Sequence, residues 1–454
     1  MNSPLPDRPA SAPAYAARVR LAEPALPAKP RHNWFLYAFL VLLPLQNLQT
    51  GYMPNLGGGL NFLNVGFGLA MLGALACRGG IAARAPVHGW ILAYATYAVF
   101  SLFVGFANVS SETEEHFNIL KDALLAVMLI FVVEMSVTDW TTLKRTMAAM
   151  LLPLPYMLRV TWDQHASVNR WHYSDALRIS GTFSLLGANE YAAFCVTMAV
   201  VAFALLLAGK LPRRWRVALA AAVGMMGICV MWSYSRTAYI ALLLGLLSVV
   251  LLWRARWKMI LPLFLAALVL PNFMPASVVE RFDSTTIEEG KRDESTEMRF
   301  EFWQIAWDNF TQHPVFGSGF HTFHHHEINP FNMDTHNFFM RELTEKGIVG
   351  FCITLGMLLS ILRVCWRTMA TSPPDSLAYA LGLGMVGAWL ALVVGNFFGD
   401  RFTYYPVIGY FWTWLGLTLK AREFAGTARE TATETPRAVP PLREYARPRS
   451  YADG

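Results

Sequence analysis

Long apolar runs dominate this sequence and decide what it can fold into. A helix that crosses a membrane needs about 20 mostly apolar residues, and about twelve runs approach or reach that length. Charged residues make up only 15% of the 454-residue chain, whereas soluble proteins carry about 25%. The runs therefore predict an all-α, polytopic transmembrane bundle with about twelve spans. They cover residues 34–48, 60–77, 87–107, 117–136, 147–161, 189–208, 217–233, 237–252, 259–271, 347–362, 378–398 and 405–419.

Polar stretches divide the chain into five parts. The polar tails, which have no apolar core, are expected to be disordered on the cytoplasmic side. The large segment between the ninth and tenth predicted spans has the composition of a mostly helical outer loop, and loops of this length are usually functional. The parts are residues 1–33 (tail), 34–271 (spans one to nine), 272–346 (large periplasmic loop), 347–422 (spans ten to twelve) and 423–454 (tail).

Lysine and arginine alternate between successive loops. With a cytoplasmic N-terminus, the inner loops contain Lys144, Arg145, Arg213 and Arg254, whereas the outer loop 108–116 contains no Lys or Arg. Because cytoplasmic loops of membrane proteins are enriched in these residues, both termini are predicted to lie inside. The chain is then expected to be a multi-pass bacterial inner-membrane protein with a periplasmic functional face. Its net charge of +6 reflects topology, and no nucleic-acid partner is expected.

The large loop has recognisable helices of its own. Phe300, Trp303, Trp307 and Phe310 recur at helical spacing within 296–312. This amphipathic stripe is typical of a helix that lies on a membrane surface. A second helix is predicted to start near Asp334 or Thr335, which are good N-caps, and to run to Gly347.

Two arginines at the predicted outer boundary are candidate phosphate ligands. Arg236 lies between Ser235 and Thr237 in a turn with almost no loop, so its charge is held at the membrane edge. Such an arginine can extend to lipid headgroups, but a charge at this depth more often has a functional partner. Arg178 lies in the long outer loop close to Gly181. Two guanidinium groups suit a diphosphate, because each binds phosphate oxygens through two hydrogen bonds.

His336 is the candidate catalytic base. It lies at the predicted start of a helix, where the positive end of the helix dipole disfavours the imidazolium form. A neutral imidazole can accept a proton near neutral pH. A histidine at a helix start can also be purely structural, but the topology places His336 on the same side as both arginines.

The remaining ionisable residues are weaker candidates. Lys121, at the outer end of the fourth span, is a possible third phosphate ligand, whereas Asp122, Asp400 and Arg401 are interpreted as structural. The histidine cluster at 321–326 has no metal-site spacing, and no Asp-x-Asp pair occurs in the outer segments. No metal and no cofactor are therefore predicted.

Several of these segments together resemble the O-antigen ligase and O-antigen polymerase family. The resemblance covers roughly residues 170–420, and residues 272–346 correspond to that family's large periplasmic loop. Each motif is short, and the order, spacing and shared sidedness of the motifs make the combination specific. The motifs are Arg178–Phe183 with Asn189, Ser235–Ala238, Trp303–Phe320, His336–Asn337 and Glu345–Gly350.

This resemblance implies a metal-independent, inverting glycosyltransferase of the membrane-embedded C type. Such enzymes use a glycan carried on undecaprenyl diphosphate, a membrane lipid. A ligase passes the glycan to a sugar hydroxyl of lipid A–core, and a polymerase passes it to another repeat unit. The resemblance implies that Arg178 and Arg236 hold the donor diphosphate and that His336 deprotonates or positions the acceptor hydroxyl.

Two alternatives remain open. An O-antigen or exopolysaccharide polymerase shares the same short motifs as a ligase. A transporter or flippase is the alternative from another class, because twelve spans is a common number in transporters. However, the hydropathy shows no inverted repeat, and the notable polar residues lie at one edge and not at the midplane, where transporters usually bind their substrates.

Overall fold

The structure is a computed structural model. It describes residues 31–52, 57, 61–77, 79–82, 85–109, 113–167, 177–259, 261–262, 265, 279, 286–287, 291–292 and 294–434. The described residues belong to one compact unit, Arg31–Gly454. The terminal tails are largely outside the described residues, as is most of the predicted span 259–271.

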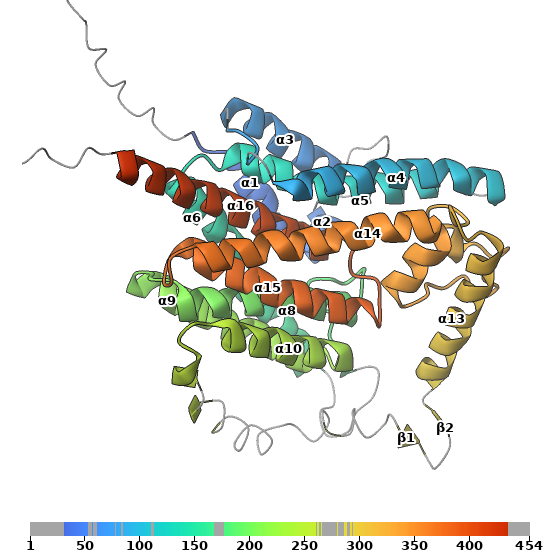
Figure 1. Ribbon diagram of the computed structural model, residues 1–454. Helices are drawn as coiled ribbons and strands as arrows, with labels where there is room; N and C mark the ends of the chain where they lie inside the picture. The colour runs from blue at the N-terminus through green and yellow to red at the C-terminus, as the bar shows by residue number, and fades with distance from the viewer. Residues whose placement is uncertain are drawn as a thin grey trace, which may run out of the picture. The chain divides into compact units, whose positions relative to one another are not determined.

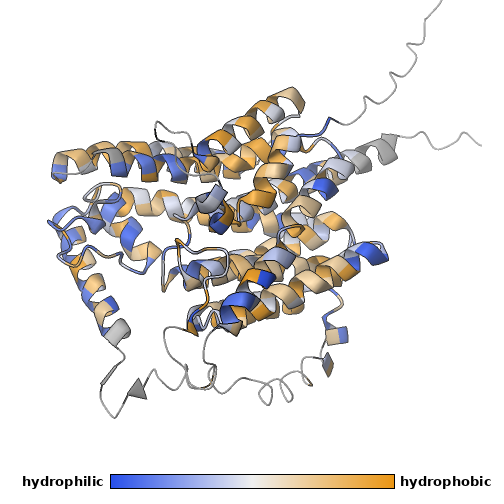
Figure 2. Cartoon of the chain, turned by 180° about the vertical axis from the view of Figure 1, so that it is seen from behind, coloured by the Kyte–Doolittle hydropathy of each residue, from blue (hydrophilic) through white to orange (hydrophobic). Residues whose placement is uncertain are grey.

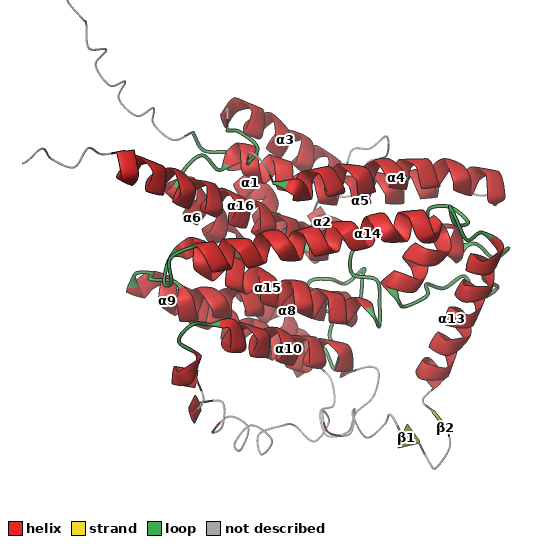
Figure 3. Cartoon of the chain, viewed as in Figure 1, coloured by secondary structure: helices red, strands yellow, loops and turns green. Residues whose placement is uncertain are grey.

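Nearly all of the described secondary structure is α-helical, which confirms the predicted fold class (Figures 1 and 3). One short exception is an antiparallel pair of two-residue strands, β1 (Thr286–Ile287) and β2 (Lys291–Arg292), in the register Thr286↔Arg292 and Ile287↔Lys291. The helices are α1 (Trp34–Leu42), α2 (Gln46–Tyr52), α3 (Phe62–Cys77), α4 (Pro86–Asn108), α5 (Thr113–Ser136), α6 (Trp140–Leu151), α7 (Leu154–Ala166), α8 (Ala188–Ala208), α9 (Arg213–Trp232), α10 (Arg236–Leu252), η2 (Arg256–Met259), α13 (Glu294–Gln312), η4 (Thr322–His324), α14 (Phe338–Thr371), α15 (Leu377–Asn396) and α16 (Tyr405–Glu434).

Within the described residues, five helices are long and apolar enough to cross a membrane: α4, α8, α9, α14 and α15. The helices α3 and α10 are apolar but shorter. The chain is therefore a membrane protein, but the predicted number of about twelve spans is not confirmed. Two predicted spans are each divided into two short helices, at Pro44 and at Pro153. Proline explains both breaks, because it cannot donate the backbone hydrogen bond that continues a helix.

Two helices, α8 and α15, form the centre of the bundle. Most of their residues are buried, and α9, α10, α14 and α16 pack around them. Glycines allow this close packing: a Cβ on Gly245 of α10 would come within 2.7 Å of Val200, and one on Gly387 within 2.8 Å of Val249. Small residues are the usual means by which membrane helices approach closely. Figure 2 shows apolar residues along these helices and hydrophilic residues mainly toward their ends.

The predicted amphipathic helix of the large loop is present as α13, which lies across one end of the bundle (Figure 1). Its inner side is anchored by the buried Phe302 and Ala306. Phe300 and Trp307 of the predicted stripe are half exposed, at 47% and 50%. The indole Nε1 of Trp303 donates to the carbonyl of Thr335 at 3.0 Å. This bond fixes α13 to the segment that leads into α14.

Two of the motif segments, residues 314–319 and residues 344–349, pair with each other through backbone hydrogen bonds. The backbone N–H of Ser318 donates to Thr344 at 3.0 Å, and that of Ile348 donates to Pro314 at 2.9 Å. Between them α14 is kinked at Gly347, whose φ is +62°. A Cβ at Gly347 would lie 2.3 Å from the carbonyl oxygen of Val315. The close approach needs glycine, so this pairing explains Gly317 and Gly347, whose added Cβ atoms would each meet backbone atoms of the other segment.

Replacing Gly347 with alanine is therefore expected to destabilise the protein by about 2 kcal/mol or more. The left-handed backbone alone costs an L-residue about 1–2 kcal/mol, and the new methyl group would collide with backbone atoms of residues 315 and 317. Thermal unfolding in detergent measures the effect. The control is Gly224→Ala on α9, where a Cβ meets nothing within 4 Å, and a midpoint equal to that control would contradict this account of the kink.

Two helix ends differ from the sequence expectations. The N-cap of α14 is Asn337, whose side chain accepts from the N–H groups of Phe339 and Met340, and not Asp334 or Thr335. The hydroxyl of Thr335 instead donates to the carbonyl of Asn337 at 2.9 Å, which shapes the turn before the helix. At the other end, α16 continues past residue 422 to Glu434, because this stretch contains three Ala and three Glu, which favour helix.

Candidate functional site

The loop before α8 holds Arg178 in place. The side-chain amide of Gln164 bonds both the N–H and the carbonyl of Gly181, each at 2.9 Å. Gly181 has a φ of +54° and lies directly over the ring of Tyr191, where a Cβ would not fit. Thr182 Oγ1 donates to the carbonyl of Pro44 at 2.7 Å. The loop is thus tied to three different helices or their ends, and Arg178 projects from an ordered segment.

Arg178 is half buried and its Nη2 donates to Asn189 Oδ1 at 2.7 Å. Its Nε is buried and has no hydrogen-bond acceptor among the described residues. Because Asn189 is a neutral amide, this bond orients the guanidinium without neutralising its charge. Such a group favours an anionic ligand.

Arg236 is the first residue of α10 and follows a tight turn. The turn passes through the left-handed Tyr234, with a φ of +51°, and the buried Ser235. This confirms the predicted short connection between α9 and α10. Arg236 therefore lies at the positive end of the α10 dipole. Its own charge and the dipole both favour an anion there.

A narrow cavity connects the surroundings of both arginines. Asn189, Ser235, Thr237 and Arg401 contribute its polar lining, and small apolar residues of α8, α10 and α15 complete it. Its volume of about 10 Å³ suffices for about one water molecule. The partner of Arg178 and both neighbours of Arg236 therefore face the same space, although the space holds no sugar in this conformation.

Arg401, interpreted from the sequence as structural, is a buried member of this lining. Its Nη1 lies 2.7 Å from Glu190 Oε1, and the backbone N–H donates to Asn396 Oδ1 at 2.7 Å. Arg401 and Glu190 are 4% and 9% exposed. Removing one member of a buried ion pair leaves the other charge uncompensated, so this pair fixes the position of Arg401 whatever else it does.

His336 lies immediately before the N-cap of α14 in the left-handed conformation, with a φ of +51°. Burial lowers the pKa of His336, and the charges of Arg299, Arg401 and His324 lower it further, whereas Asp334 opposes the shift. The imidazole is consequently neutral at a pH where an exposed histidine would begin to be protonated. The pKa effect of Arg401 also shows that His336 is close enough to the narrow cavity to feel its charge.

A larger cavity of about 270 Å³ is lined in part by Thr403 and Tyr404, which follow Arg401 in the chain. One part of its lining is polar and includes Asp334, His324 and Arg341. The lining also includes the apolar Leu43 and Leu63. Asp334 of this cavity and Arg401 of the narrow one both act electrostatically on His336, although the histidine itself lines neither cavity among the described residues.

Arg341 is a site residue that the sequence reasoning missed. It lines the larger cavity, and its guanidinium pairs with Asp400 and with Glu345 and donates to Thr403 Oγ1 at 2.6 Å. The side chain is 6% exposed. The available signal was the set of charged residues at helical spacing, from Arg341 to Lys346, directly before an apolar span.

Lys121 is near the larger cavity but does not contribute to the lining of either cavity among the described residues. Its Nζ lies 3.3 Å from Asp122 Oδ1 and 3.3 Å from Asn118 Oδ1. Asp122 does line the larger cavity. Asn189, which bonds Arg178, and the neighbours of Arg236 therefore share the narrow cavity, whereas Arg178, Arg236, His336 and Lys121 themselves are not part of either lining.

The histidine cluster forms a row of rings and not a ligand set. His321 and His324 have ring centroids 4.8 Å apart, and His116 of α5 meets His321 edge-on at 5.4 Å. Burial lowers the pKa of both His321 and His116. In the part of the chain that the structure describes, no group of three or more His, Cys, Asp or Glu side chains is arranged to hold a metal ion.

Comparison with known families gives one match. Residues 221–355 match the model of the O-antigen ligase family, which confirms the resemblance over that part of the chain. The matched range contains Arg236, His336 and Arg341, whereas Arg178, Lys121 and Arg401 lie outside it. The search of curated proteins found no match.

Proposed function

We propose that this chain, which residues 221–355 assign to the O-antigen ligase family, transfers a glycan from undecaprenyl diphosphate to a sugar hydroxyl of lipid A–core. The family supports an activity of the ligase or polymerase type. The observation that supports the proposal is the arrangement around Arg401: the partner of Arg178 and the neighbours of Arg236 line one cavity together with Arg401, and the charge of Arg401 acts on His336.

The donor diphosphate is assigned to the arginine side of this arrangement. Arg178 and Arg236 would bind its oxygens, with the α10 N-terminus adding its partial positive charge. The narrow cavity has room for about one water molecule in this conformation, so the diphosphate would bind at its mouth. The larger cavity is slightly below the usual 300–1,000 Å³ of ligand sites. It suits one sugar unit of the donor, with its apolar side toward the lipid carrier.

The proposed reaction is a single displacement at the anomeric carbon. His336 accepts the proton of the acceptor hydroxyl as its oxygen forms a bond to that carbon. The bond between the anomeric carbon and the diphosphate oxygen breaks, and its electron pair leaves with the diphosphate. Attack opposite to the leaving group inverts the configuration. The guanidinium groups stabilise the charge that develops on the leaving group, which is the type of interaction that contributes most to such reactions.

Chelation is expected to leave the activity unchanged. In the proposed site, arginines neutralise the departing diphosphate, which is the task that a divalent ion performs in other transferases. Purified protein treated with EDTA should therefore transfer glycan at the untreated rate. Inhibition that added magnesium reverses would contradict the metal-independent mechanism.

Deletion of the gene tests the proposal against its alternatives. Loss of a ligase should leave bare lipid A–core and long polymer on the lipid carrier at the periplasmic face. Loss of a polymerase would leave single repeat units attached to the core. Loss of a transporter would instead retain lipid-linked glycan at the cytoplasmic face, so each alternative has its own product pattern on gels and in carrier-lipid extracts.

A further inference from the structure

A third cavity lies toward the opposite end of α14 from the candidate site. It has a volume of about 250 Å³ and lies between α4, α14 and α16. The lining residues that matter here are Trp90, Gly356, Leu359, Arg363, Arg367 and Arg422. Nothing in the proposed glycan transfer uses this groove.

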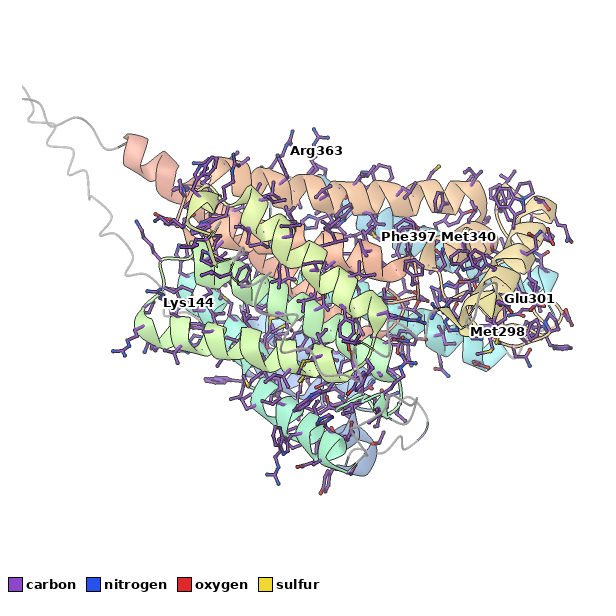
Figure 4. All side chains as sticks on the ribbon, turned by 90° about the horizontal axis from the view of Figure 1, so that it is seen from below. Lys144, Met298, Glu301, Met340, Arg363 and Phe397 are labelled. Carbon is purple, nitrogen blue, oxygen red and sulfur yellow. The ribbon has the colours of Figure 1, made fainter. Side chains whose placement is uncertain are left out.

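Three arginines converge on the groove from two helices. Arg363 and Arg367 are one turn apart on the same face of α14, and Arg422 approaches from α16. Figure 4 shows Arg363 on the outer side of its helix. Among the described residues that line the groove, none is Asp or Glu. The neighbouring Glu423 is 2.8 Å from Lys420. The groove therefore carries a concentrated positive charge.

Part of the groove lining is apolar, and this part includes the flat indole ring of Trp90. Trp90 is 40% exposed and Leu359 is 61% exposed. A Cβ at Gly356 would come within 2.3 Å of the Trp90 ring, so the glycine allows the indole to lie against α14. Tryptophan is enriched where helices meet lipid headgroups. A cationic rim beside an apolar floor matches a phospholipid better than a free anion.

The predicted position of the groove in the membrane agrees with a phospholipid ligand. The alternation of Lys and Arg predicts that this end of α14 lies at the cytoplasmic leaflet. Leu359 is one turn closer to the middle of the span than Arg363, so an acyl chain would run from the arginines along Leu359 and Trp90. Basic pockets between helices on this side bind anionic lipid headgroups.

We propose that this groove binds an anionic phospholipid of the cytoplasmic leaflet. Its phosphate would be held by the guanidinium groups of Arg363, Arg367 and Arg422, and one acyl chain would lie along Trp90 and Leu359. Such a lipid would hold α14 against α4 and α16 at the end away from the candidate site. The binding does not depend on glycan transfer.

Native mass spectrometry of the full chain from nanodiscs tests the site, with phosphatidylglycerol and phosphatidylcholine as the competing lipids. The wild type is expected to retain phosphatidylglycerol preferentially. The triple variant R363Q/R367Q/R422Q should lose this preference by about tenfold or more, because each basic residue contributes to the attraction. Trp90→Ala should weaken retention while the charge preference remains.

The matched control is R213Q/R214Q/R216Q, which removes the same charge from exposed positions at the start of α9 on the same predicted side. It should retain phosphatidylglycerol as the wild type does. Equal loss of the phosphatidylglycerol preference in both triple variants would show that surface charge in general, and not this groove, attracts the lipid. No loss in either variant would show that the groove is not a lipid site. Displacement of the lipid by inorganic phosphate alone would contradict the part assigned to the acyl chain. Unfolding midpoints identify any variant that fails to fold.

Discussion

Arg236→Ala is expected to lower the rate of glycan transfer about 10²–10³-fold while the protein remains in the membrane. Loss of a single donor that stabilises developing negative charge typically has this effect, about 3–4 kcal/mol. Arg236 stands at the N-terminus of α10, and its neighbours Ser235 and Thr237 line the narrow cavity. The transfer rate is measured with purified protein and lipid-linked glycan.

Two further variants make this result specific. Arg236→Lys should recover part of the rate, because it keeps the charge and loses the planar fork. Arg159→Ala is the matched control, since Arg159 is an exposed arginine of α7 whose side chain is 78% accessible. It should transfer glycan normally. A normal rate in Arg236→Ala would remove this arginine from the mechanism, and an equal loss in Arg159→Ala would show that general charge is responsible.

His336→Ala is expected to lower the transfer rate about 10²–10⁴-fold, the usual contribution of a positioned base. The wild-type rate should rise with pH as His336 loses its proton. Because burial and nearby positive charges lower the pKa of His336 from its ordinary 6.5, the midpoint of this rise should lie below pH 6.5. The pH dependence of kcat/KM, which reports the pKa values of the free enzyme, measures it.

The His336→Ala variant should retain only a slow transfer rate, and this rate should no longer fall at low pH. His326→Ala provides the control, since His326 is exposed and does not line either of the two cavities of the site. A transfer rate that still falls at low pH in His336→Ala would assign the titration to another group. Transfer at the wild-type rate in that variant would exclude His336 as the base.

Much of the helical framework could be predicted from apolar periodicity. The run 189–208 corresponds closely to α8, and the run 378–398 to α15. Both are apolar on all sides, so their central place in the bundle follows from composition. The runs at 34–48 and 147–161 were wrong as single spans, because Pro44 and Pro153 each interrupt a helix. Hydropathy alone does not register such interruptions.

The site could be predicted only in part. The motifs around Arg178, Arg236 and His336 were visible because unusual polar residues stood at the ends of apolar runs. The pairs that organise the site were not visible, because Glu190 and Arg401 are separated by 211 positions and meet only through tertiary packing. The same holds for Arg341 and Asp400. Two buried ion pairs across distant helices leave no local pattern in a sequence.

The glycines of the large loop show a different limitation. Gly317, Gly319 and Gly347 were noticed as parts of family motifs, but their spacing did not reveal that the motifs pack on each other. Their geometry assigns them to the support of the site. The imidazole of His336, in contrast, is not required by the backbone, and the chemistry is expected to depend on it.

Reconstituted transfer by the purified protein tests the central claim most directly. Wild-type protein in liposomes, supplied with undecaprenyl diphosphate-linked glycan and lipid A–core, should produce glycan-bearing lipid A–core and one free undecaprenyl diphosphate for each glycan transferred. The His336→Ala protein in the same liposomes should leave both substrates almost unchanged. Donor that remains intact with the wild-type protein, or a glycan product formed equally by both proteins, would contradict the account.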